Sequence, residues 1–238
     1  MKKILIISFL SVILLFVSAY LVFQLTKSRA FQFYGGLVNK VETTEKVVAL
    51  TFDDGPGKNT DEILRILDEG NVKATFFLTG REMEEDMDAT KKIVDAGHEI
   101  GNHSYSHQRM VLKTPRFVKE EIERTDTLIR EAGYEGDIHF RPPYGKRLLV
   151  LPHYLAKQDR LTIYMGIEPE SYPDVATDAD KIADYVVEHI EPGAIILLHV
   201  MYESRMESLA SVEKIVSQLK AQGYEFVTVS ELLGYGER

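Results

Sequence analysis

The stretch Val47-Val48-Ala49-Leu50-Thr51-Phe52-Asp53-Asp54-Gly55-Pro56 decides the fold. A β-rich run leads directly into two neighbouring carboxylates and a Gly-Pro turn. On a regular strand adjacent side chains point to opposite faces, so Asp53 and Asp54 could share a site only where the strand is broken. The Gly-Pro pair supplies such a break at the strand end. Taken alone, Asp-Gly-Pro is also ordinary turn chemistry, with an aspartate capping the next helix.

The rest of the chain repeats this strand pattern between amphipathic stretches. The β-rich runs are 47–53, 73–79, 99–103, 139–143, 161–167, 194–200 and 225–230. The helical patterns are 60–69, 82–96, 115–132, 179–189 and 208–222. Such alternation predicts an α/β fold in which helices cover a parallel sheet. Seven strands favour a closed or nearly closed β/α barrel, with an open doubly wound sheet as the alternative. In both, function gathers at the C-terminal ends of the strands.

The N-terminal segment has a different composition. Residues 1–30 contain four basic residues and no acid, which leaves −13 for the remainder of a chain of net charge −9. Residues 4–25 are uncharged and almost wholly apolar, long enough to cross the ~30 Å core of a bilayer. We therefore expect a transmembrane signal anchor over 1–27, a juxtamembrane linker over 28–45 and one domain over 46–238. Val17-Ser18-Ala19 resembles a signal cleavage site, which would make the protein secreted, but the apolar run continues past it. In both cases the domain is expected outside the cytoplasm.

Composition excludes several classes of protein. The chain has no cysteine, which rules out disulfides, thiolate zinc sites, iron–sulfur clusters and a cysteine nucleophile. Its negative charge argues against a general nucleic-acid binder, which needs a basic face to neutralise phosphates. No protein partner can be inferred.

Two histidines follow the third predicted strand. His103 and His107 are four residues apart, so they would share one face if this segment were a helical turn. An isolated pair of this spacing is weak evidence for a metal. With a carboxylate from a neighbouring strand end, it becomes a two-histidine, one-carboxylate triad with positions open for water. His98 is expected to be structural.

Two further strand ends carry polar side chains. Arg141-Pro142-Pro143-Tyr144-Gly145 predicts a rigid loop after the fourth strand, because proline fixes φ and removes a donor. Arg141 could orient a carboxylate by a bidentate pair or simply form a surface salt bridge. The most hydrophobic strand, 194–198, leads to His199, which alone would be read as a core residue. Four motifs at four strand ends together predict one site.

These motifs, in this order, resemble the polysaccharide deacetylases of carbohydrate esterase family 4, the NodB-homology domain. The resemblance covers nearly all of 46–233 and rests on Thr51-Phe52-Asp53-Asp54-Gly55, His103-Ser104-Tyr105-Ser106-His107, Arg141-Pro142-Pro143-Tyr144 and Leu197-Leu198-His199. It implies a distorted (β/α) barrel of about seven strands. It also implies a metal-dependent hydrolase that removes acetyl groups from N-acetylated sugars.

The resemblance assigns a metal site and a base. Asp54, His103 and His107 would bind the divalent metal, most often Zn²⁺ in this family. Asp53 would be the general base that takes a proton from the attacking water, and Arg141 would hold Asp53 in position.

It also assigns the remaining catalytic roles. The backbone N–H of Tyr144 would stabilise the oxyanion together with the metal. His199 would be the general acid that protonates the departing amine. Leu197 would line the slot for the acetyl methyl group.

One motif departs from the family pattern. Many members carry an Asp-Trp pair after the fifth strand, and the best register places Ser171 and Tyr172 there. Tyr172 can wall a substrate pocket, but Ser171 cannot supply the negative charge that tunes His199. Asp174 or Glu170 could reach His199 instead. If neither does, the pKa of His199 should lie lower than in a typical member, and the alkaline limb of the pH–rate profile should come earlier.

The extracytoplasmic placement favours a cell-envelope substrate. Peptidoglycan N-acetylglucosamine is the first expectation, followed by N-acetylmuramic acid and a secreted N-acetylated polysaccharide. The acidic domain favours neutral or cationic glycans. The alternatives are a membrane-anchored glycan-binding protein with little turnover, and a metal hydrolase of other acyl linkages.

Overall fold

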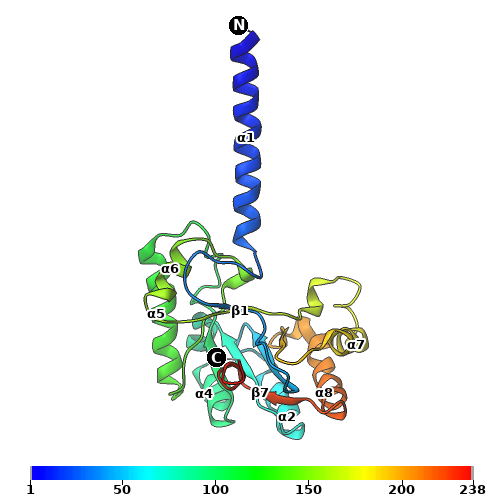
Figure 1. Cartoon of the computed structure of the whole chain (residues 1–238). Coiled ribbons are helices and arrows are strands. Elements are labelled where there is room, and N and C mark those ends of the chain that lie inside the picture. The colour runs from blue at the N-terminus through cyan, green and yellow to red at the C-terminus, as the bar shows by residue number, and fades with distance from the viewer. Residues whose placement is uncertain (1, 237–238) are drawn as a thin grey trace.

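The structure is a computed structural model that describes residues 2–236. Helix α1 (Lys2–Thr26) stands away from a single folded domain (Figure 1). Residues 3–26 of this helix are long and apolar enough to cross a bilayer, and the same features would suit a signal sequence.

The sheet is parallel and centred on β2 (Val47–Asp53). The strand order is β4 (Glu99–Asn102), β3 (Thr75–Leu78), β2 and β6 (Ile195–Leu198), and β7 (Glu225–Val227) pairs with the first half of β2. A separate parallel pair joins β1 (Leu37–Val38) to β5 (Thr162–Ile163). Single parallel bridges, Asn102 to Phe140, Phe140 to Thr162 and Ile167 to Ile196, continue the pairing from β4 through β5 to β6. The result is a distorted α/β barrel, as expected, although the predicted strand 139–143 is reduced to one bridging residue.

Helices pack around this sheet. They are α2 (Thr60–Glu69), α3 (Gly80–Glu85), α4 (Met87–Asp95), α5 (Pro115–Glu131), α6 (Val150–Ala156), α7 (Ala179–His189), α8 (Met206–Ala221) and α9 (Val229–Leu233), with short 3₁₀ turns η1 (Pro143–Gly145), η2 (Pro169–Ser171) and η3 (Glu203–Arg205). The five predicted helical patterns all form helices, but the pattern over 82–96 is divided. Asp86 leaves the helical conformation and accepts a hydrogen bond from the backbone N–H of Ala89 at 2.9 Å, so it caps α4.

Two helices were not predicted. Helix α6 follows the proline-rich loop, and α9 replaces the end of the predicted strand 225–230. Thr228 and Glu231 form a capping box that starts α9, so the strand ends at Val227.

The segment expected to be a linker, 28–45, is packed on the domain. Its strand β1 pairs with β5, and Val41 donates a backbone hydrogen bond to Gly193 at 2.9 Å. Val41 is buried with Val47 and Ala49. The packed domain therefore starts before Lys46.

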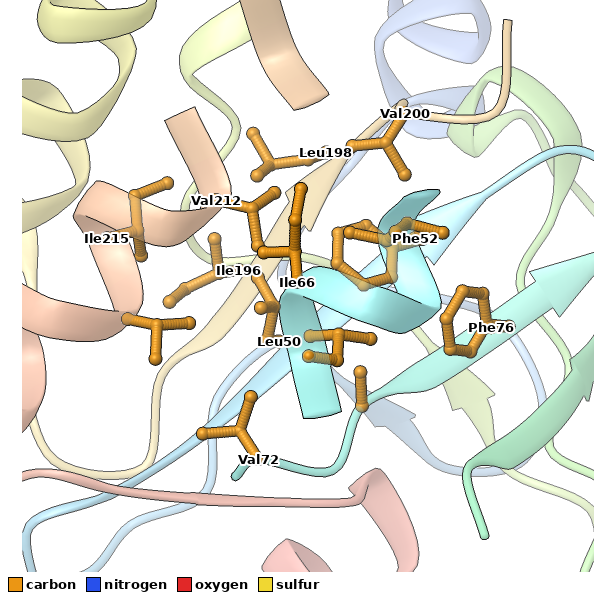
Figure 2. Close-up of a cluster of buried hydrophobic side chains, with 14 of the residues drawn as sticks. Leu50, Phe52, Ile66, Val72, Phe76, Ile196, Leu198, Val200, Val212 and Ile215 are labelled. Atoms are coloured by element: carbon orange, nitrogen blue, oxygen red, sulfur yellow. The ribbon is translucent and has the colours of Figure 1, made fainter. Parts of the chain in front are cut away.

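The core explains how β2 presents its last residues. Leu50 and Phe52 point outward into a cluster with Ile66 of α2, Phe76 and Ile196 (Figure 2). By the two-residue period, Thr51 and Asp53 point the other way, into the barrel. The outward hydrophobic side chains thus fix which face Asp53 occupies.

Candidate metal and catalytic site

Asp53 lies at the end of β2, almost fully buried beside Arg141. The Arg141 guanidinium donates from Nη1 to Asp53 Oδ1 at 2.6 Å and to Thr51 Oγ1 at 2.8 Å, and it lies 4.0 Å over the Phe77 ring. Burial acts to raise the pKa of Asp53, but Arg141 and the nearby histidines outweigh it and hold the pKa below its ordinary value. Asp53 is therefore an oriented carboxylate that stays ionised.

Asp54 shares this edge of the barrel because its backbone is left-handed, with φ of 71°. This conformation turns the side chain away from the alternation of β2 and toward two histidines. Asp54 Oδ1 lies 3.9 Å from His103 Nε2 and 3.3 Å from His107 Nε2. Two adjacent carboxylates thus reach one site with different neighbours.

The histidines are held by the loop after β4. His103 is buried, and its Nδ1 donates to the carbonyl oxygen of Arg141 at 2.7 Å, which leaves Nε2 as a free ligand atom. Burial and the neighbouring His103 lower the pKa of His107, so its ring is neutral near pH 7. The segment is not a helical turn, so the condition under which the spacing alone would place both rings on one face is not met. Ser104 and His107 both have positive φ, 66° and 53°, and a loop brings the rings to a centroid distance of 4.9 Å.

These three residues fit a metal ion. The ligand atoms of Asp54, His103 and His107 all lie within 4.8 Å of one another. Asp54 Oδ1 is buried and accepts no hydrogen bond from any residue in 2–236. A buried carboxylate oxygen without a donor is costly, and a cation between the two imidazoles removes that cost.

The proline-rich loop places a free backbone donor next to this site. Tyr144 has φ of 57° within η1, and its ring lies 4.7 Å from the ring of His107. Gly145 donates its N–H to Pro142 O, whereas the N–H of Tyr144 has no acceptor among the described residues. An N–H in this state can donate to a substrate oxygen.

His199 lies at the end of β6 and is held by Glu170 of η2. The Glu170 carboxylate contacts His199 Nδ1 and accepts from the His199 backbone N–H at 3.0 Å. Ser208 of α8 donates to the same carboxylate. Burial opposes the charged imidazolium, but Glu170 overcomes it and raises the pKa of His199 to about 9.

The structure therefore answers the question left by Ser171. Glu170 takes the place of the missing aspartate, so the condition for a lowered His199 pKa is not met. Ser171 and Asp174 are exposed. Tyr172 is also exposed and packs against Tyr185 at 5.0 Å between ring centroids, so it lies outside the cavity that the structure forms. The register correctly located the segment but misplaced the functional side chain by one residue.

A cavity of about 490 Å³ opens over these groups. Its lining includes Asp53, Asp54, His103, His107, Tyr144, Leu197 and His199. Leu197 and Met165 form its apolar floor and are both buried. Gly145 of the proline-rich loop also lines it, and sequence reasoning did not find the remaining four lining residues, Met165, Glu168, Tyr202 and Arg205. Tyr202 and Arg205 follow His199 closely in sequence, but no motif marks them.

Comparison with known proteins identifies the polysaccharide deacetylase family. A sequence model of the polysaccharide deacetylase family matches residues 40–162. A peptidoglycan-N-acetylglucosamine deacetylase of Bacillus cereus is 35% identical over 202 residues, covering 84% of this chain and 70% of the relative.

Solved structures are similar over most of the chain. The crystal structure of a peptidoglycan N-acetylglucosamine deacetylase has a TM-score of 0.79 at 30% identity and covers 84% of this chain and 95% of that chain. A family pseudoenzyme from Bacillus anthracis has a TM-score of 0.76 at 27% identity, over 87% of this chain and 72% of that one.

Proposed function

This chain belongs to the polysaccharide deacetylase family, and we propose that it hydrolyses the N-acetyl groups of peptidoglycan N-acetylglucosamine and releases acetate. The observation that carries the proposal is one cavity that brings Asp53 and His199 together with Asp54, His103 and His107, whose ligand atoms lie within 4.8 Å of one another. The similar proteins named as peptidoglycan N-acetylglucosamine deacetylases support this choice of substrate.

The proposed metal ligands are Asp54, His103 and His107, and the proposed ion is Zn²⁺. When bound, such an ion polarises the acetyl carbonyl and lowers the pKa of water. Asp53 accepts the proton of the attacking water. Its lowered pKa and its bond to Arg141 keep it ionised and aimed for this step.

The rest of the site acts on the other side of the amide. The Tyr144 N–H donates to the developing oxyanion, where preorganised donors have a large effect. His199 is protonated at pH 7 and gives a proton to the departing amine, because Glu170 occupies its Nδ1 and leaves Nε2 free. Leu197 and Met165 contact the acetyl methyl group.

We also propose that α1 is a membrane anchor and that the domain acts outside the cytoplasm. Its length, its apolar sequence and its exposure along residues 3–23 support this. A cell-wall substrate requires the same placement.

A glycan-binding role with little turnover is the second candidate, favoured by the similarity to a pseudoenzyme. The presence here of metal ligands, base, acid and backbone donor argues for turnover.

The test is product analysis. Purified peptidoglycan is treated with the full chain loaded with Zn²⁺, digested with a muramidase and examined by mass spectrometry. We expect a loss of 42 mass units (one acetyl exchanged for hydrogen) on glucosamine and not on muramic acid. Loss on muramic acid alone, or release only of O-acetyl esters, would overturn the proposed substrate. Saturable glycan binding without any acetate would support the second candidate.

A further inference from the structure

Three cations from separate segments gather where α1 meets the domain. Lys27 follows α1, Arg109 lies in the loop after β4, and Lys146 follows η1. Burial and then the charges of Lys27 and Arg109 lower the pKa of Lys146. None of the three forms an ion pair with a carboxylate among residues 2–236. In a domain of net negative charge, an unpaired cation cluster indicates an anionic partner.

This cluster lies at the level where α1 would leave the hydrocarbon. Phe23 of the last turns of α1 has Lys27 Nζ 5.1 Å and Lys146 Nζ 4.9 Å from its ring centroid. Aromatic and basic side chains at the end of an apolar helix are typical of the headgroup region of a bilayer. The cations therefore lie where lipid phosphates would be.

Exposed apolar side chains lie in the segments next to these cations. Phe31 and Phe33 lie in the segment after α1, with ring centroids 5.2 Å apart, and are 46% and 44% exposed. Leu112 is 87% exposed three residues after Arg109, and Leu149 is 46% exposed three residues after Lys146. Helix α6, which begins after Leu149, lies at the end of the domain from which α1 emerges (Figure 1).

Arg147 connects the C-terminal end of α1 to the loop that carries Tyr144. Its guanidinium is almost fully buried and donates to Ser28 O at 2.6 Å, Phe31 O at 3.2 Å and Gly145 O at 3.1 Å. Its backbone N–H donates to Thr26 O at 3.0 Å. The orientation of the helix is thereby tied to the loop that carries Tyr144.

We propose that the collar formed by Lys27, Arg109, Lys146, Phe31, Phe33, Leu112 and Leu149 docks the domain on the surface of an anionic bilayer. The Arg109 guanidinium lies 4.8 Å over the Tyr144 ring, so the docked surface borders the metal site. The catalytic cavity then opens beside the membrane and reaches glycan close to it. The inference rests on the proposed membrane anchoring by α1 and not on the deacetylation.

The chain offers a clean test because it contains no tryptophan. Leu149→Trp and, separately, Phe31→Trp place one fluorophore in the collar, and Tyr235→Trp places one in an exposed position near the C-terminus. Each full-length variant is reconstituted in vesicles of brominated phosphatidylcholine, alone or mixed equally with brominated phosphatidylglycerol. We expect strong quenching of both collar probes in the mixed vesicles, weaker quenching in phosphatidylcholine, and no quenching at 235.

Two triple variants that each remove three positive charges test whether the collar cations cause the docking. Lys27→Gln/Arg109→Gln/Lys146→Gln should abolish the dependence on phosphatidylglycerol, since each cation lost lowers the ratio of docked to undocked domain by about fivefold. Lys91→Gln/Lys119→Gln/Lys181→Gln, at exposed positions elsewhere, should retain it.

Two results would overturn the inference, and they differ. Collar probes quenched no more than the 235 probe, in a chain that resists carbonate extraction from the vesicles, would contradict docking alone. A chain that carbonate removes from the vesicles would contradict both the anchoring and the docking.

Discussion

Two clusters with buried acids and histidines lie at opposite ends of the strands, and they differ in how their buried polar atoms are satisfied. The cluster at the N-terminal ends of the strands comprises Glu99, Thr75, His139 and Ser230. Glu99 accepts from Thr75 Oγ1 at 2.6 Å and from the Ser230 backbone N–H at 3.1 Å, and Ser230 Oγ bonds both Glu99 and His139. The rim cluster is Asp53, Asp54, His103 and His107. There the buried Asp54 Oδ1 accepts nothing from residues 2–236.

The difference separates a structural acid from a ligand. Burial of a carboxylate is tolerated when protein donors satisfy it, as at Glu99. At Asp54 the acceptor faces His103 Nε2 and His107 Nε2, an arrangement that fits the proposed metal ion. Burial alone does not distinguish the two clusters.

The largest effect is expected for Asp54→Asn. Replacing an anionic ligand of a three-residue site should remove bound metal and lower the rate of acetate release by more than about a thousandfold. Metal content by elemental analysis and the rate are measured together. Full activity with stoichiometric metal would show that Asp54 is not a ligand.

Glu99→Gln should act on stability instead. An amide nitrogen would face hydroxyl and N–H donors, which costs about 1–3 kcal/mol in the free energy of unfolding. Urea denaturation measures the loss, and bound metal should be unchanged. A Glu99→Gln variant that kept its stability but lost metal would contradict the structural role of Glu99.

Glu170→Gln tests which carboxylate raises the pKa of His199, the proposed general acid. His199 has its pKa raised from 6.5 to about 9, so its protonated form contributes stability that is complete below pH 6.5 and is lost as the pH rises through 9. Without the Glu170 charge the pKa falls, and the alkaline limb of the pH–rate profile should move down by about two units, which lowers the rate at pH 8 by about tenfold.

Asp174→Asn is the matched control, since Asp174 was the other sequence candidate and is exposed. A shift of the limb with Asp174→Asn and none with Glu170→Gln would refute the assignment.

Ser208→Ala should give the smallest effect. It removes one hydrogen bond to the Glu170 carboxylate, and the rate at pH 8 should fall by less than about tenfold. Ser211→Ala, one turn further along α8, removes a hydroxyl that donates to Ser208 O at 2.8 Å and controls for a general effect on the helix. Equal losses in the two variants would assign Ser208 a purely structural role.

Sequence patterns predicted the elements whose hydrophobic period is unbroken. β2 and α7 have the predicted bounds, and the four motifs reach one rim because parallel strands end together. The predictions fail where the backbone conformation of a single residue determines the local structure. The left-handed φ of Ser104 and His107 produces a loop, which the spacing of the two histidines did not indicate. In η2, Glu170 contacts His199, and Tyr172 after it is exposed.

Charge totals do not predict where charges gather. The acidic domain favours neutral or cationic glycans, which stays a prediction, and within it Lys27, Arg109 and Lys146 form a cationic group without a carboxylate partner among residues 2–236. These residues are far apart in sequence, and only the fold brings them together.

The most direct measurement is acetate release from purified peptidoglycan by the full chain and two variants. Asp53→Asn belongs to the rim cluster, and Glu99→Gln belongs to the cluster at the N-terminal ends of the strands. The account predicts acetate from the Zn²⁺-loaded chain and none after chelation. It predicts a loss of about 10²–10⁴-fold in Asp53→Asn with metal retained, and a near-normal rate in Glu99→Gln below its unfolding temperature. Metal bound without acetate release, or an Asp53→Asn variant as active as the native chain, would contradict it.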